Sequence, residues 1–227
     1  MRVMILAAGR GERLRPLTDT VPKAMVQAGG KPLIGWHLER LAAAGYGEAV
    51  INVSHLADRI VEGLGDGKRY GVRITYSRER EPLETAGGIA KARALLGEAP
   101  FLLVNADIYC EFDFSALRRV SLGARLAHLV LVPNPPHRSR GDFTLADGVV
   151  GDGAEPRYTY AGIAVMSPAM VAGVAAEQKA PLAPLLYAAA ARRLVGGELY
   201  RGLWQDVGTR ERLAELEAHL APGSAQR

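Results

Sequence analysis

Cysteine is nearly absent from this sequence, which has a single one, Cys110, among 227 residues. One cysteine cannot form an internal disulfide, so we expect a reducing, cytoplasmic compartment. Long apolar runs are also missing. No stretch reaches the roughly 20 residues of a membrane helix, and the apolar run from Met1 to Ala8 is too short for a signal peptide. We therefore expect no membrane association.

A strong charge of one sign is missing as well. The 28 Lys and Arg residues against 24 Asp and Glu leave a net charge of +4, and no run rich in Lys or Arg occurs. A nucleic-acid-binding surface would need such a cluster, so we expect small-molecule partners instead. Apolar residues make up 48% and charged residues 23% of the chain, which is typical of a folded globular protein.

Internal repeats and low-complexity segments are missing too, and no hexapeptide repeats follow Thr209, which excludes a C-terminal β-helix. The chain instead alternates apolar runs with helical patterns. Strands are expected over residues 3–8, 49–53, 72–76, 101–104, 126–132, 160–166 and 195–200, with a hairpin over 143–150. Helices are expected over 31–45, 56–64, 89–96, 168–176 and 181–193, and from residue 209.

This alternation predicts an α/β fold: a single-domain, three-layer αβα sandwich around a mostly parallel, Rossmann-like sheet. We expect the domain to span residues 1–221 and a frayed tail to follow over 222–227. A monomer or a small homo-oligomer is expected.

A glycine-rich, basic loop follows the first expected strand directly. Gly9 and Gly11 would let backbone N–H groups come close to a polyphosphate, and Arg13 adds a forked cationic donor. The loop is not a dinucleotide fingerprint, because Leu14 stands where a small residue is needed, and it lacks the Gly-Lys-Ser/Thr of a Walker loop. With Lys23 downstream, the segment predicts phosphate binding of another kind.

Two aspartates stand at positions suited to a metal. Asp107 follows the apolar strand at 101–104, where α/β sheets bind ligands, and Asp206 shortly precedes the last helix. Singly, each could equally be a turn residue or an acid at a helix start. Mg²⁺ prefers one or two carboxylates and takes its other ligands from phosphate and water. Together with the phosphate loop, the pair predicts a Mg²⁺ site.

Covalent catalysis has no candidate in this sequence. The histidines lie in no nucleophile or metal motif and are expected to be packed or solvated: His37, His55, His128, His137 and His219. Cys110 is expected to pack in the hydrophobic core and not to act as a nucleophile. Of the aromatic residues, Trp204 could stack on a ligand, and one of Tyr158 and Tyr160 is expected to face a pocket.

The motifs resemble those of the sugar-1-phosphate nucleotidylyltransferases, and the resemblance covers nearly the whole chain. The segments that carry it are Leu6 to Thr18 with Pro22-Lys23, Glu81 to Gly88, Leu103 to Asp107, Tyr160 to Ile163, and Trp204 to Thr209. Within the family, Pro82 to Thr85, His128 to Val132 and Arg140 to Phe143 are most similar to the short uridylyltransferases that serve cell-wall sugar recycling. Two positions depart from the wider family, which commonly has Gly where Ala106 and Glu84 stand.

The resemblance implies an enzyme that transfers UMP from UTP to a sugar 1-phosphate with Mg²⁺ and releases pyrophosphate. It implies that Arg13, Lys23, Asp107 and Asp206 are catalytic, and that Asp107 and Asp206 hold the metal. The implied nucleotide-binding residues are Ala8, Gly9, Gly11, Glu12, Arg13, Lys23, Glu81, Pro82, Thr85, Ala86 and Gly87. Those implied for the sugar phosphate are Asn105, Gly141, Asp142 and Gly162, and Arg138 or Arg140 could meet a carboxylate on the sugar.

Two alternatives stay open at this point. One changes the substrates, to a mannose-1-phosphate guanylyltransferase-like or other sugar-nucleotide reaction. The other is a nucleotide-sensing domain with the same fold and no turnover, although the four implied catalytic side chains are all present.

Overall fold

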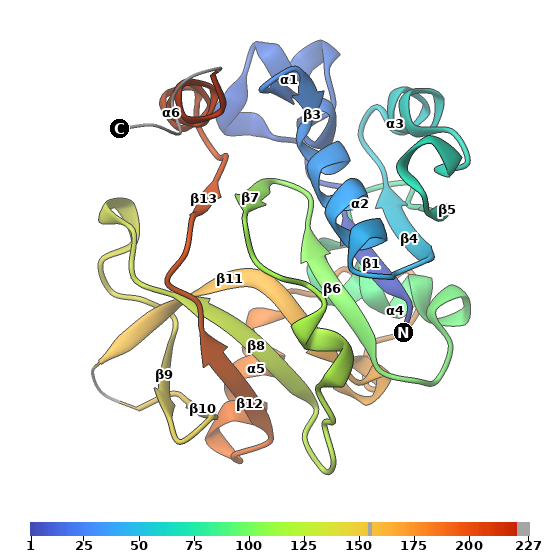
Figure 1. Ribbon diagram of the computed structural model, residues 1–227. Coiled ribbons are helices and arrows are strands. Elements are labelled where there is room, and N and C mark those ends of the chain that lie inside the picture. Colours follow the sequence, from blue (N-terminus) through green and yellow to red (C-terminus); the bar gives the residue numbers. More distant parts are fainter. Residues whose placement is uncertain (154–155, 222–227) are drawn as a thin grey trace.

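A computed structural model describes residues 1–153 and 156–221, and within them one nine-stranded sheet forms the centre of the molecule (Figure 1). The strands lie in the order β5-β4-β1-β6-β11-β8-β12-β10-β9. Their bounds are β1 Val3–Leu6, β4 Glu48–Val53, β5 Arg73–Arg78, β6 Phe101–Asn105, β8 Ala127–Val132, β9 Phe143–Ala146, β10 Val149–Gly151, β11 Arg157–Met166 and β12 Val195–Leu199.

The sheet is parallel in its first half and mixed in its second. β5, β4, β1 and β6 pair in parallel, and β12 pairs in parallel with β8. β11 runs antiparallel to both of its neighbours in the sheet order, β6 and β8, and β9 and β10 form the expected hairpin. The α/β fold is confirmed, while the parallel arrangement that we expected for most of the sheet is limited to these strands. Apolar runs predict burial on both faces, but they do not fix strand direction.

Helices cover both faces, as the three-layer prediction requires. The helices are α1 Leu17–Thr20, α2 Leu33–Ala43, α3 Ala57–Leu64, α4 Glu84–Leu96, α5 Ala183–Ala191 and α6 Arg210–Leu220. The alternation along β1 shows the layering: Val3 and Ile5 join the core under α2 and α3, whereas Met4 joins the core under α4 and α5. Burial on both faces explains why this strand is apolar throughout.

Two small antiparallel pairs lie outside the main sheet. β2 (Gln27–Ala28) pairs with β3 (Lys31–Pro32), and β7 (Ile108–Cys110) pairs with β13 (Trp204–Asp206), which Figure 1 shows beside it. A third apolar cluster, which includes Leu33, Tyr109, Val207 and Leu216, anchors α6 to this end of the molecule. These contacts bring the last strand and helix back to the loop that follows β6.

Three expectations need correction. The helix α4 begins at Glu84, five residues before its expected start, because the segment around Ala180 accepts its first N–H groups. Within the expected helix at 168–176 only a 3₁₀ turn, Pro168–Val171, forms. β7 and β13 were not expected at all. The tail at 222–227 lies outside the described residues. No helix among those described is long and apolar enough to cross a membrane.

Candidate active site

The glycine-rich loop leaves the carboxyl end of β1 and folds back on itself. Gly11 has φ +66°, and a Cβ there would lie 2.9 Å from Thr18 Cγ2, so this position favours glycine on both grounds. Thr18 Oγ1 donates a hydrogen bond of 2.8 Å to the Gly11 carbonyl oxygen and fixes the turn. A 3₁₀ turn, Glu12–Leu14, follows, in which Leu14 is buried and Arg13 is exposed.

Three adjoining cavities open at this end of the sheet. We name them the loop cavity, the central cavity and the side cavity. Their volumes are about 820, 220 and 420 Å³, respectively. Gly9, Lys23 and Asp107 line both the loop and the central cavity, and Glu84 lines all three. The predicted nucleotide residues on the loop cavity are Gly9, Gly11, Glu12, Arg13, Lys23, Glu81 and Pro82, and those on the central cavity include Ala8 and Thr85.

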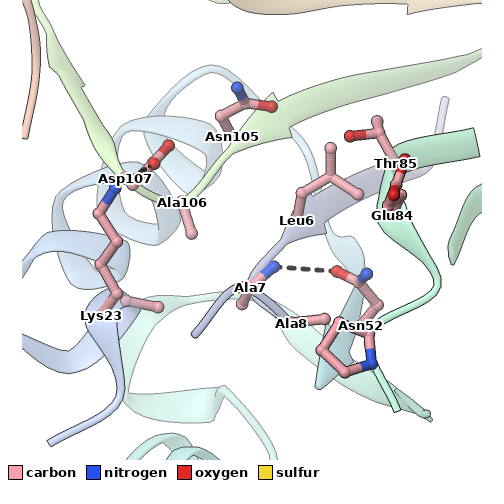
Figure 2. Close-up of a pocket in the computed structure, with 13 residues that line it drawn as sticks. Leu6, Ala7, Ala8, Lys23, Asn52, Glu84, Thr85, Asn105, Ala106 and Asp107 are labelled. Atoms are coloured by element: carbon pink, nitrogen blue, oxygen red, sulfur yellow. Dashed lines mark hydrogen bonds and ion pairs between the residues drawn. The ribbon is translucent and has the colours of Figure 1, made fainter. Parts of the chain in front are cut away.

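Lys23 and Asp107 lie next to each other at one side of the central cavity, as Figure 2 shows. Lys23 Nζ lies 2.5 Å from Asp107 Oδ2, and the lysine side chain is only 12% exposed. Asp107 follows β6 and precedes β7, so the end of a buried strand fixes its position, as expected. The backbone then links it to the second aspartate, because the Val207 N–H donates to the Asp107 carbonyl oxygen at 2.8 Å.

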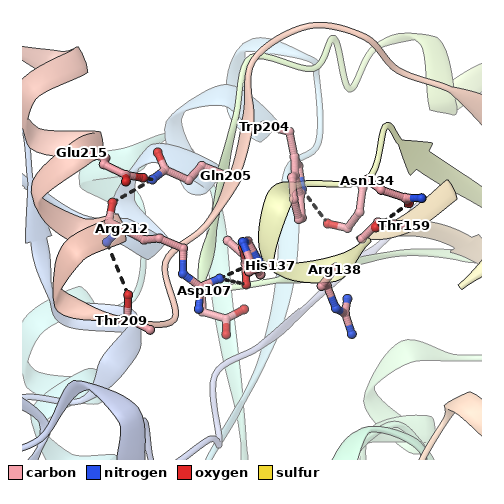
Figure 3. Close-up of polar contacts among 12 residues, drawn as sticks. Asp107, Asn134, His137, Arg138, Thr159, Trp204, Gln205, Thr209, Arg212 and Glu215 are labelled. Carbon is pink, nitrogen blue, oxygen red and sulfur yellow. Dashed lines mark hydrogen bonds and ion pairs between the residues drawn. The ribbon is translucent and has the colours of Figure 1, made fainter. Parts of the chain in front are cut away.

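Asp206 reaches the same place from the far end of the chain, through the pairing of β13 with β7. Its Oδ2 accepts a hydrogen bond from Arg212, and His137 Nε2 lies 2.9 Å from its Oδ1. That second contact lacks hydrogen-bond geometry, so Oδ1 is a buried oxygen without a hydrogen-bond donor among the described residues. Figure 3 shows His137 and Arg212 converging beside Asp107.

These residues fit a divalent cation. An orphaned carboxylate oxygen and a second aspartate held close by suit the one or two carboxylates that Mg²⁺ takes from proteins. Within the described chain no cluster of three or more His, Cys, Asp or Glu offers a metal site made of protein ligands alone. His137, which we expected to be packed or solvated, is 38% exposed and contacts both Asp206 and Arg212.

Sequence reasoning missed a buried polar network at the wall of the central cavity, which Asn52 lines. Asn52 Oδ1 accepts from the Ala7 N–H at 2.9 Å, and Asn52 Nδ2 donates to Glu79 Oε1 at 2.7 Å. Glu79 Oε2 accepts from the Leu83 N–H at 2.9 Å. The network ties the end of β1 to the segment before α4. An asparagine within the apolar run Ala49–Val53 was the available signal, because buried amides require partners.

The side cavity contains the predicted sugar residues Asn105 and Asp142, together with Arg138. Asp142 Oδ2 accepts from the Tyr160 N–H at 2.8 Å, so the backbone of β11 orients this carboxylate. Tyr160, and not Tyr158, lines the cavity; its hydroxyl is buried without a partner among the described residues, and burial raises the pKa of Tyr160. Arg140 lies exposed outside the three cavities.

Five of the implied site residues line none of the three cavities: Asp206, described above, and the buried or backbone-spacing residues Ala86, Gly87, Gly141 and Gly162. Ala86 and Gly87 are buried, and both of their N–H groups donate to the Ala180 carbonyl oxygen, at 2.9 and 3.1 Å. Gly162, with φ +78° at a bulge in β11, gives room to Asn105, because a Cβ there would lie 2.6 Å from Asn105 Nδ2. Gly141 likewise gives room to the backbone at Arg157–Tyr158.

Comparison with known proteins identifies the family of this chain. The model of the family described as nucleotidyl transferase matches residues 2–141. The chain is 49% identical to an N-acetylmuramate alpha-1-phosphate uridylyltransferase of Neisseria meningitidis serogroup B, over 96% of this chain and 97% of that protein. It is 36% identical to a protein of the same name from Caulobacter vibrioides, over 96% of both.

A solved structure supports the fold. HddC from Yersinia pseudotuberculosis superposes with a TM-score of 0.78 at 23% identity, over 97% of this chain and 99% of that one. The family motifs, the near full-length relatives and the fold agree: the chain belongs to the nucleotidyl transferase family, and it is a nucleotidyltransferase.

Proposed function

We propose that this enzyme transfers UMP from UTP to N-acetylmuramic acid α-1-phosphate, giving UDP-N-acetylmuramic acid and pyrophosphate. The observation that carries the proposal is the continuity of the cavities. The loop cavity, whose cations are Arg10, Arg13, Lys23 and Lys179, meets the side cavity through the central cavity, and Lys23 pairs with Asp107 in the wall that the loop and central cavities share. The names of the two near full-length relatives supply the nucleotide and the sugar.

The triphosphate would lie along the loop cavity. Backbone N–H groups of the Gly9–Glu12 segment would bind its phosphates, and Arg13 would neutralise charge that grows on the leaving pyrophosphate. Lys23 would bridge the α-phosphate and the incoming sugar phosphate. A sugar phosphate is already largely dianionic at neutral pH, so attack on the α-phosphorus needs no general base. Catalysis then consists of positioning and charge neutralisation.

Asp107 and Asp206 would hold Mg²⁺, which supplies charge neutralisation and orientation at the phosphates. The base would contact Glu81, Pro82 and Thr85, while Asn105 and Asp142 would hold the sugar. Arg138 is the cation on the side cavity that suits the lactyl carboxylate of N-acetylmuramic acid. We further propose a role in peptidoglycan recycling and, from the single buried Cys110, a reducing cytoplasmic setting.

The test follows pyrophosphate release with Mg²⁺, using UTP, GTP and dTTP against the 1-phosphates of N-acetylmuramic acid, N-acetylglucosamine and mannose. We expect the highest kcat/KM with UTP and N-acetylmuramic acid 1-phosphate, and loss of the reaction with EDTA. Preference for GTP and mannose 1-phosphate would favour the guanylyltransferase alternative. Absence of pyrophosphate with every pair would favour a nucleotide sensor.

A further inference from the structure

Glu84 occupies a backbone conformation that suits glycine. It is the first residue of α4 and has φ +59°, in the left-handed region. Only five non-glycine residues of the described chain have positive φ, and Glu84 and Glu177 are the two glutamates among them. The region is costly for a residue with a Cβ, and glutamate lacks the short polar side chain that eases the cost for Asp or Asn.

The surrounding chain holds this conformation in place. The Ala180 N–H donates to the Leu83 carbonyl oxygen at 3.0 Å, and the Ala86 N–H donates to the Ala180 carbonyl oxygen at 2.9 Å. These two hydrogen bonds bracket Glu84 on both sides. A strained backbone conformation persists only where surrounding contacts hold it in place, and such conformations are frequent at ligand-binding sites. A glycine would relieve the strain, yet the position carries a long carboxylate.

The side chain of Glu84 stands where the loop, central and side cavities meet. It lines all three and is 42% exposed. Lys179 Nζ lies 3.6 Å from Glu84 Oε1 and is itself 68% exposed, so the carboxylate is only partly neutralised. Both proposed substrates carry anionic phosphates, which an ionised carboxylate repels. A carboxylate accepts hydrogen bonds and donates none, so it must pair with donor groups.

We propose that Glu84 is a specificity-determining residue that accepts hydrogen bonds from sugar hydroxyl or amide N–H groups where the cavities meet. The inference rests on the proposed function. It adds the Glu84 carboxylate as a group that recognises the substrate where the three cavities meet. Two sugars offer such donors: the ribose of the nucleotide and the hexose of the sugar 1-phosphate. Hydrogen bonds that involve a charged group are among the stronger ones in proteins.

The experiment compares Glu84→Gly with Glu177→Gly. Glu177 also has positive φ, at +67°, and is also ion-paired, to Lys91 at 2.6 Å, but it lines none of the three cavities. Both variants should keep or raise the midpoint of thermal unfolding, because both relieve the same backbone strain. Only Glu84→Gly should lower kcat/KM with UTP and N-acetylmuramic acid 1-phosphate, by about tenfold to a hundredfold.

Deoxy substrates identify the sugar. If Glu84 reads the ribose, the wild type should prefer UTP over 2′-deoxy- or 3′-deoxy-UTP, and Glu84→Gly should lose that preference. If Glu84 instead accepts hydrogen bonds from the hexose, the wild type should prefer N-acetylmuramic acid 1-phosphate over its 4-deoxy or 6-deoxy analogue or over the analogue without the 2-acetamido group. Glu84→Gly should then lose that preference. Calorimetric binding of the same ligands gives this comparison without turnover.

Three results would overturn the proposal. One is an unchanged kcat/KM and unchanged ligand binding in Glu84→Gly. Another is an equal loss with every analogue together with a higher Mg²⁺ requirement, which would place Glu84 at the metal. The third is a fall in thermal midpoint for Glu84→Gly that Glu177→Gly does not show, which would make the residue structural. A wild type that releases no pyrophosphate with any pair rejects the proposed function instead, and the binding comparison still decides the role of Glu84.

Discussion

Asp107 and Asp206 differ in the protein groups that surround them. Asp107 pairs with Lys23, whereas Asp206 is held by Arg212 and keeps one buried oxygen that accepts no hydrogen bond from the part of the chain that the structure describes. We predict that Asp107→Asn or Asp206→Asn lowers kcat by about a hundredfold or more, as for other lost electrostatic stabilisers, while the circular dichroism spectrum stays native.

Asp147→Asn is the matched control for this pair. Asp147 lies in the β9–β10 turn with φ +50°, a conformation that asparagine tolerates, so the change should leave kcat as it is. Near-normal rates of both active-site variants at limiting Mg²⁺ would exclude these aspartates as the metal ligands.

Arg13 is one of the exposed cations of the loop cavity, and its guanidinium lies against Gly208, next to that of Arg212. We predict that Arg13→Ala lowers kcat more than it raises KM for UTP, because charge on the leaving pyrophosphate grows in the transition state. Steady-state kinetics of Arg13→Ala and Arg15→Ala test this. Arg15 pairs with Asp19 outside the three cavities and serves as the control. A change in KM alone would limit Arg13 to ground-state binding.

Among the elements, the link between β1 and the segment before α4 depends on buried hydrogen bonds from Asn52 and Glu79. Glu79→Ala would leave the Asn52 amide and the Leu83 N–H without their acceptor. We predict a loss of about 2–4 kcal/mol in the free energy of unfolding, measured with urea, and a higher KM for UTP. The exposed neighbour Arg80→Ala should change neither quantity. An equal effect of both changes would contradict a role for the buried network.

The elements that the sequence predicts well are those with a strong local signal. β1 and β6 are continuous apolar runs, and α6 begins at Arg210, directly after the N-cap residue Thr209, whose Oγ1 accepts from the Arg212 N–H. β7 and β13 could not be predicted, since they are three residues long and pair only because the end of the chain returns to the loop after β6. Their pairing depends on long-range packing, and no local pattern encodes it.

The same limit applies to the candidate site. The loop glycines, Lys23 and both aspartates follow from motifs, and the structure brings them together. The roles of His137 and Arg212 do not follow, because their meeting at Asp206 depends on how the turn before β9 and the helix α6 lie in space. Buried glycines such as Gly87 look like ligand residues in the sequence, although this one makes room for the carbonyl oxygen of Gln178.

For the molecule as a whole, acid stability should depend on His37. This residue on α2 is fully buried, and its Nε2 lies 2.7 Å from the Ile108 carbonyl oxygen, to which the neutral ring donates. Burial lowers the pKa of His37 from 6.5 to about 4. Between these values the unfolded chain takes up a proton that the folded chain does not. The free energy of unfolding should therefore fall as the pH falls from 6.5 to 4, by about 3 kcal/mol from this group.

Urea unfolding at several pH values between 4 and 7.5 measures this dependence. His37→Gln should reduce the fall in the free energy of unfolding between pH 6.5 and 4, even if the variant is less stable at every pH. His55 is half-buried, and His55→Gln should show the same fall as the wild type. A slope that is the same in the wild type and in His37→Gln would show that other groups set the acid limit.

Because β13 brings Asp206 to the site by pairing with β7, the site can be completed only after β13 has been synthesised. The loop glycines, Lys23 and Asp107 are synthesised well before Asp206, which follows Asp107 by 99 residues (206 minus 107) and comes with β13. A nascent chain thus carries its phosphate-binding groups well before it can complete the carboxylate pair. We expect ribosome-stalled chains that end before Trp204 to release no pyrophosphate, because they lack Asp206 and therefore the second carboxylate of the pair.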